Sequence, residues 1–94
     1  MHTIPFRPVW KRRWNTGAAL FLGYLMAKED SNESWWPAPM EEFVSEFRST
    51  LAVAGMARET LRADQVIEVR KNGRRYEYKI NHDVLNSIET ESEK

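Results

Sequence analysis

The chain has 94 residues, four tryptophans and no cysteine, which suits one small domain with a single core. The lack of cysteine excludes a disulfide scaffold and cysteine-ligated zinc, and it favours the cytoplasm. The longest apolar stretch, residues 17–26, covers only about half of the ~20 residues that a membrane-spanning helix needs. The N-terminal residues also lack the pattern of a signal peptide.

Basic and acidic residues balance at 14 each, but they are segregated along the chain. The net charge is +4 over residues 1–14, −5 over 15–47, +4 over 48–82 and −3 over 83–94. This distribution is compatible with a basic face that binds a polyanion, and equally with a mixed, solvated surface.

Residues 1–14 are expected to form an extended basic arm. Pro5 and Pro8 disfavour a regular helix there. Within the arm, Trp10 and Trp14 flank a run of three cations. Nucleic-acid binders mix charge and stacking surface in this way, although tryptophans at this spacing are also typical of a core.

The first helix is predicted from Asn15 or Thr16, either of which can cap it, to Lys28. It is apolar on nearly every side. A helix of this kind is either central to the core or shares a face with a partner chain. The second alternative would allow a homodimer through this helix.

Two further helices are predicted, over residues 40–47 and from 51 to about 63. Proline and acids at the start of the former suit a helix N-terminus, and Ser49 or Thr50 can cap the latter. Before these helices, residues 35–36 are expected to form a short strand that pairs with the edge of a hairpin.

A β-hairpin is predicted over residues 66–80, where two alternating runs flank Asn72-Gly73. This pair favours a type I′ turn, which would place Val69 opposite Tyr76. The predicted apolar face of the hairpin consists of Ile67, Val69, Tyr76, Tyr78 and Ile80. Beyond it, Asp83 can cap a short helix, and the acidic tail 89–94 is expected to be frayed.

The predicted order is helix, short strand, helix, turn, helix, hairpin and short helix. It resembles the winged-helix variant of the helix-turn-helix over residues 15–88, and is similar to the winged-helix domains of phage and plasmid replication proteins and regulators. The matching stretches are AALFLGYL at 18–25, WW at 35–36, EEFVSEF at 41–47, VIEVRKNGRRYEYKIN at 66–81 and VLNSI at 84–88. The resemblance implies an α+β winged helix-turn-helix with a C-terminal hairpin wing.

In such domains the third helix enters the DNA major groove and the wing contacts backbone or minor groove. The resemblance therefore implies a protein of a phage or mobile element that binds double-stranded DNA in replication or transcription control. The residues expected to contact DNA are Arg70, Lys71, Arg74 and Arg75 of the wing, Thr50 and Arg62 of the third helix, and Lys11, Arg12 and Arg13 of the arm.

The third helix departs from this pattern, because its first two turns carry no Arg, Lys, Asn or Gln to read bases. Its outward side is instead expected to carry an apolar patch, Leu51, Ala52, Gly55 and Met56, while its core side carries Val53, Ala54, Ala57 and Leu61. Alternatively, the helix is rotated and the patch belongs to the core. Gly55 costs a helix about 1 kcal/mol relative to Ala, which suggests close approach by another molecule.

An exposed patch of this composition suits a protein partner better than a base edge. The alternative function is therefore a protein-binding winged-helix module. An example would be a phage-encoded inhibitor, of the anti-restriction or anti-CRISPR type, that acts on a host nucleic-acid machine.

Neither catalysis nor a cofactor is expected. His2 and His82 have no second ligand at a metal-binding spacing. The sequence also contains no nucleophile motif and no phosphate-binding glycine loop.

Overall fold

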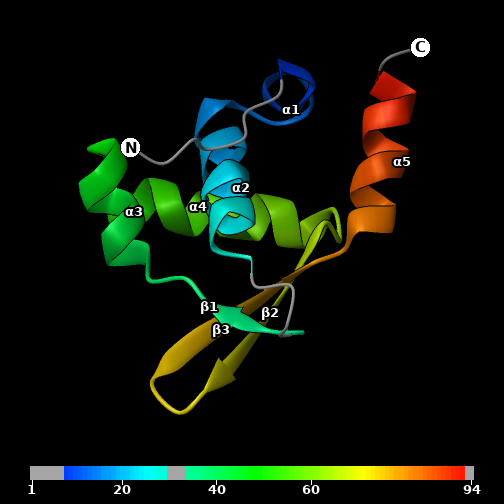
Figure 1. Ribbon diagram of the computed structural model, residues 1–94. Coiled ribbons are helices and arrows are strands. Elements are labelled where there is room, and N and C mark those ends of the chain that lie inside the picture. Colours follow the sequence, from blue (N-terminus) through cyan, green and yellow to red (C-terminus); the bar gives the residue numbers. More distant parts are fainter. Residues whose placement is uncertain (1–7, 30–33, 93–94) are drawn as a thin grey trace.

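The computed structural model describes residues 8–29 and 34–92. Its helices and strands are, in order, α1 (Pro8–Arg13), α2 (Thr16–Lys28), β1 (Trp36–Pro37), α3 (Met40–Phe47), α4 (Leu51–Ala63), β2 (Ile67–Asn72), β3 (Arg75–Ile80) and α5 (His82–Ser92). The described residues thus form an α+β fold with five helices and a three-stranded antiparallel sheet. Helices α1, α3 and α4 pack against α2, while α5 stands to one side and contacts α1. The β2–β3 hairpin projects below the helices in the view (Figure 1).

The three predicted helices are confirmed as α2, α3 and α4, and caps explain where α2 and α4 begin and where α3 ends. The Asn15 side chain accepts a hydrogen bond from the Ala18 N–H at 2.8 Å, and the Thr50 hydroxyl accepts one from the Val53 N–H at 3.1 Å. Arg48, with a φ of 52°, ends α3 in the left-handed conformation. Local capping therefore sets these helices.

The prediction of an extended arm is wrong for residues 8–13, which form α1. Pro8 occupies the first helical position, where a missing N–H breaks no helical hydrogen bond. Trp10 is buried, and its indole N–H donates to the Glu89 carboxylate at 2.8 Å. This bond joins the two ends of the described chain. Residues 1–7 lie outside the described part.

The tail was expected to fray from residue 89, but α5 continues to Ser92. Glu89 is buried and accepts the hydrogen bond from Trp10. A contact with α1 therefore stabilises this end of α5, and the helix propensity of the tail residues does not decide it. The last two residues, 93–94, lie outside the described part.

The short strand expected at residues 35–36 is confirmed as β1, which pairs with β3, and the sheet has the order β1-β3-β2. The predicted turn is wrong. Asn72 pairs with Arg75, so the loop is Gly73-Arg74. Only Gly73 of this pair has a positive φ, 65°. One left-handed residue at the first loop position is typical of a type II′ turn.

Cross-strand charges explain the shift in register. The predicted register would have placed Arg70 opposite Arg75 and Glu68 opposite Glu77, and like charges in these positions destabilise a hairpin. In the structure Arg70 lies opposite Glu77, and Glu68 lies opposite Lys79. Because the shift is two residues, the apolar face of the hairpin keeps its predicted members.

The core is centred on α2, whose aromatic side chains join three elements. The Phe21 ring lies 5.1 Å from Phe43 of α3 and 6.1 Å from Tyr78 of β3, both edge to face. The Tyr24 hydroxyl donates to the Pro39 carbonyl at 2.8 Å. Of the two alternatives for this helix, it is therefore the one central to the core. No helix among the described residues is long and apolar enough to cross a membrane.

Candidate interaction site

The apolar patch on α4 is exposed. Met56 is 71 % exposed, Leu51 56 % and Val53 39 %, whereas Ala54 and Leu61 are fully buried. The alternative of a rotated helix with the patch in the core is therefore excluded. The start of α4 presents apolar side chains to the solvent, where a soluble surface normally carries polar ones.

Val53 was expected to face the core, and that prediction is wrong. It lies at the edge of the contact between α4 and α2. A Cβ added at Gly17 would come within 3.1 Å of Val53 Cγ1. Because Gly17 has no side chain, it covers Val53 only in part, and the rest of the valine adds to the exposed patch.

Gly55 lies within this patch, and nothing in the structure requires a glycine there. A Cβ added at Gly55 would meet nothing within 4 Å. Its backbone is helical, without a positive φ. Internal packing therefore does not explain the residue, and the space above it is open to another molecule.

The tip of the hairpin carries three exposed cations, Lys71, Arg74 and Arg75, none of which forms an ion pair with another described residue. Arg70 differs from them. Its Nε donates to Glu77 at 2.8 Å, and its guanidinium lies 4.5 Å from the centroid of the Trp35 ring. Arg70 therefore stabilises the outer face of the hairpin and is not free in the way that the tip cations are.

The cations of α4 are partly neutralised. Arg62 Nη1 and Arg58 Nε lie 3.3 and 3.5 Å from the carboxylate of Glu59. The Arg58 guanidinium also lies over the Tyr76 ring, 4.9 Å from its centroid. The Thr50 hydroxyl is used as the cap of α4. Arg58 therefore links α4 to the hairpin, and Glu59 neutralises part of the charge of α4.

A groove of about 460 Å³ lies between the start of α4, the segment before α3 and the hairpin. Its lining consists of Pro37, Ala38, Pro39, Met40, Glu41, Leu51, Arg74, Arg75, Tyr76 and Tyr78. Leu51 belongs both to this groove and to the α4 patch, so the two surfaces are continuous. The tip arginines border an apolar floor.

Two tyrosines of β3 also line this groove. Tyr76 is 44 % exposed, whereas Tyr78 is buried and its hydroxyl has no hydrogen-bond partner among the described residues. Burial raises the pKa of the Tyr78 hydroxyl, and the nearby Arg58 opposes part of that rise. The hydroxyl therefore stays protonated and can donate.

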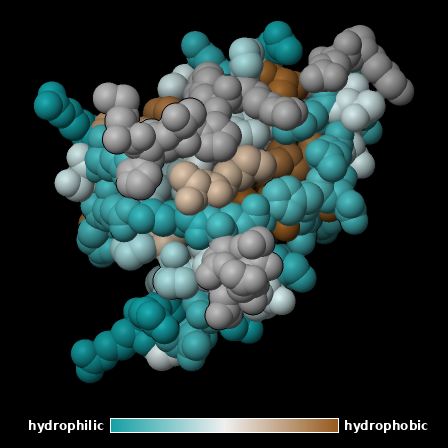
Figure 2. All heavy atoms as spheres, in the orientation of Figure 1, coloured by the Kyte–Doolittle hydropathy of each residue, from teal (hydrophilic) through white to brown (hydrophobic). Residues whose placement is uncertain are grey.

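The structure does not bring all the predicted DNA contacts together. Lys11, Arg12 and Arg13 lie on α1, at the end of the molecule opposite the hairpin tip (Figure 1). Arg13 pairs there with Asp64 at 3.3 Å. The visible surface of the hairpin, at the lower left, is hydrophilic, whereas the brown, hydrophobic atoms lie above it (Figure 2). The basic residues thus form two separate regions.

The sequence-based prediction missed the groove, its proline segment and the exposed Tyr76. Tyr76 was expected on a covered apolar face opposite Val69, but the register places it opposite Lys71, one pair nearer the tip. The alternating charges of the two strands were the signal that could have found it.

The described residues contain no group of three or more side chains suited to hold a metal ion. His82 Nε2 instead lies 2.7 Å from Glu29 Oε2. Searches of protein-family models, curated proteins and solved structures gave no match to this chain.

Proposed function

We propose that the chain is a winged-helix module that binds a partner protein through α4 and the hairpin wing. The element order and the sheet order β1-β3-β2 support this proposal, since they follow the pattern that the sequence resembles. In this pattern α4 is the helix that meets the target and the β2–β3 hairpin is the wing.

The exposed apolar start of α4 is the observation that carries the proposal. Leu51 and Met56 are more than half exposed, and the open space above Gly55 allows a partner's backbone or side chain to approach closely. Apolar anchors of this kind supply much of the affinity of protein interfaces. Phosphates offer these side chains no apolar contact, and base edges offer only the thymine methyl group.

Charge defines the partner further. The groove that continues the patch is bordered by Arg74 and Arg75, and Glu41 is its one acidic lining residue. A partner with apolar side chains flanked by Asp or Glu complements this surface. A phage-encoded inhibitor that binds such a site on a host nucleic-acid machine would have this arrangement.

Selection of random-sequence peptides on the immobilised full-length protein tests this proposal. We expect enrichment of peptides that combine acidic and apolar residues. Met56→Glu should weaken their binding about tenfold or more, measured by fluorescence anisotropy. Asn86→Glu adds the same charge on the exposed side of α5 and should leave binding unchanged. Peptides whose binding survives Met56→Glu would contradict the proposal.

A second candidate function is binding of double-stranded DNA in replication or transcription control. It is favoured by the three tip cations, Lys71, Arg74 and Arg75, which have no ion pair among the described residues. Cations on a protruding turn can contact phosphates or enter a minor groove. The partial neutralisation of Arg58 and Arg62 by Glu59 argues for weak binding without sequence preference.

A labelled random duplex separates the two functions. If three cations neutralise three phosphates, the DNA affinity should fall about 40-fold between 50 and 200 mM salt. Replacing Arg74 and Arg75 together with Glu should abolish this binding, and Met56→Glu should not. Salt-sensitive duplex binding without any enriched peptide family would favour the second function. Absence of both activities would overturn both.

A further inference from the structure

The two edges of the sheet differ in a way that the proposed function does not explain. The β1 edge is only two residues long and contains Pro37, and both features protect an edge against further pairing. The β2 edge is six residues long, contains no proline and keeps a regular register along its length. Among the described residues β2 pairs only with β3.

One hydrogen bond at the base of the hairpin determines which backbone groups of β2 point away from β3. The Asn81 N–H donates to the Val66 carbonyl at 2.8 Å, so residues 66 and 81 form a hydrogen-bonded pair. In an antiparallel ladder such pairs alternate with non-hydrogen-bonded ones. Ile67, Val69 and Lys71 therefore direct their N–H and C=O groups away from β3.

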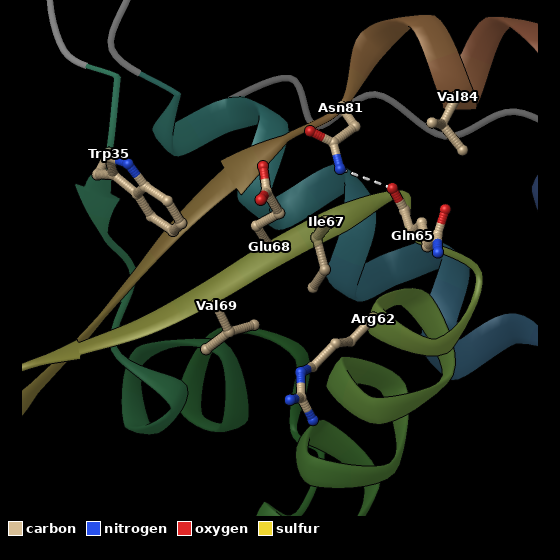
Figure 3. A pocket seen from close by; sticks show the side chains of 8 residues that line it. All are labelled: Trp35, Arg62, Gln65, Ile67, Glu68, Val69, Asn81 and Val84. Carbon is tan, nitrogen blue, oxygen red and sulfur yellow. Dashed lines mark hydrogen bonds between the residues drawn. The ribbon is translucent and has the colours of Figure 1, made fainter.

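The space beside this edge is open. A groove of about 570 Å³ runs along β2. Figure 3 shows Glu68 and Trp35 on one side of the strand, and Val69 and Arg62 on the other. This groove shares no lining residue with the groove at the start of α4, so occupants of the two would not compete for the same side chains.

We propose that the β2 edge binds β2 of a second copy of this chain, antiparallel, with Val69 opposite the partner subunit's Val69. In this register the outward N–H and C=O groups of Ile67, Val69 and Lys71 form hydrogen bonds with the backbone of the other strand. Glu68 lies opposite the partner subunit's Arg70, and Arg70 lies opposite the partner subunit's Glu68. The two three-stranded sheets join into one continuous sheet.

Charge complementarity selects this register over its neighbours. A shift toward the N-terminal end of β2 places Glu68 opposite the partner's Glu68, and a shift toward the tip places Arg70 opposite the partner's Arg70. Like charges opposite each other destabilise a strand pair. The side chains are available, because Glu68 and Arg70 are each about half exposed. Arg70 donates to Glu77 through Nε and has no second ion pair among the described residues. Glu68 lies 3.9 Å from Lys79.

Two charge reversals test this pairing in the full-length protein. We expect wild type to dimerise in sedimentation equilibrium between roughly 10 µM and 1 mM. Glu68→Arg alone and Arg70→Glu alone should each weaken the dimer tenfold or more. An equimolar mixture of the two should recover it as a heterodimer, because each reversed charge then meets an opposite one. Glu91→Arg, an exposed reversal on α5, should leave the dimer intact.

A wild type that stays monomeric throughout this range would overturn the proposal. So would a mixture that stays monomeric while circular dichroism shows both variants folded. A dimer that both reversals leave unchanged would likewise contradict this interface.

Because each reversal also removes an intrachain partner, a second measurement keeps the register testable if one variant fails to fold. The chain contains no cysteine, so a single introduced thiol is specific. Val69→Cys places the two thiols opposite each other, and a short bifunctional thiol reagent should cross-link them. Lys71→Cys places its two thiols about four residues apart along the strands, roughly 13 Å, and should cross-link poorly. Equal cross-linking of both variants, or of neither, would overturn the proposed register.

Discussion

Helices α2 and α4 are both 13 residues long and both carry alanines, glycine and large apolar side chains, yet their surroundings differ. Seven residues of α2 are buried, among them Phe21, Leu22 and Leu25, because other elements of the chain cover it on nearly every side. The start of α4 leaves Leu51 and Met56 in solvent. Apolar character in α2 is therefore explained by folding, whereas in α4 it points to a contact outside the chain.

Alanine substitutions at one leucine of each helix should separate these roles most strongly. Leu22 is fully buried, so Leu22→Ala should lower the free energy of unfolding by about 2–5 kcal/mol through lost burial and a cavity. Leu51→Ala should change it by no more than about 0.5 kcal/mol. Urea denaturation followed by circular dichroism measures both. A large loss at Leu51 would show that its apolar surface serves the fold.

Alkaline pH should affect two buried tyrosines, Tyr24 of α2 and Tyr78 of β3. Burial raises the pKa of Tyr24, aided by Glu42 and Glu46, and burial also raises the pKa of Tyr78. Above pH 10 these tyrosines lose protons in the unfolded chain while the folded chain retains them. The free energy of unfolding should therefore fall as the pH rises from 10, by up to about 1.4 kcal/mol per pH unit for each tyrosine.

The two tyrosines can be told apart by replacing each with phenylalanine and comparing urea denaturation at neutral pH and above pH 10. Tyr24→Phe should lower the free energy of unfolding by about 1 kcal/mol at neutral pH, because it removes the hydrogen bond to the Pro39 carbonyl. Tyr78→Phe should be neutral or stabilising there, since the hydroxyl has no hydrogen-bond partner among the described residues. Each substitution should reduce the alkaline slope. An unchanged slope in both variants would contradict the assigned cause.

How far the sequence predicts this fold depends on whether the deciding interaction is local. Caps and periodicity correctly place α2, α3 and α4, because Asn15 and Thr50 act within one turn of the helices that they start. The predictions for residues 8–13 and 89–92 were wrong. The Trp10 indole N–H donates to Glu89, which lies 79 residues away in the sequence. The segment around Glu89 has the composition of a solvated tail, so the sequence alone does not indicate this contact.

The candidate site was predictable only where local interactions determine it. The α4 patch follows from helical periodicity and is exposed as expected. The groove beside it depends on how the hairpin packs on α4, and therefore on a register that the Asn72-Gly73 turn signal alone assigned wrongly. The pairing of Arg70 with Glu77 indicates the register used by the structure. Cross-strand charge thus carries more information in this hairpin than its turn.

Gly55 offers the smallest change and the one that most directly tests why α4 differs from α2. Gly55→Ala should raise the free energy of unfolding by about 0.5–1 kcal/mol, because alanine favours a helix and the added methyl group meets nothing within 4 Å. The same methyl group occupies the space into which a partner would approach, so binding of the selected peptides should weaken. Ser45→Ala, on the exposed side of α3, should also stabilise the protein but leave peptide binding unchanged. If Gly55→Ala stabilised the fold and left binding intact, close approach at this glycine would be refuted, and the partner would have to contact the patch through Leu51 and Met56 alone.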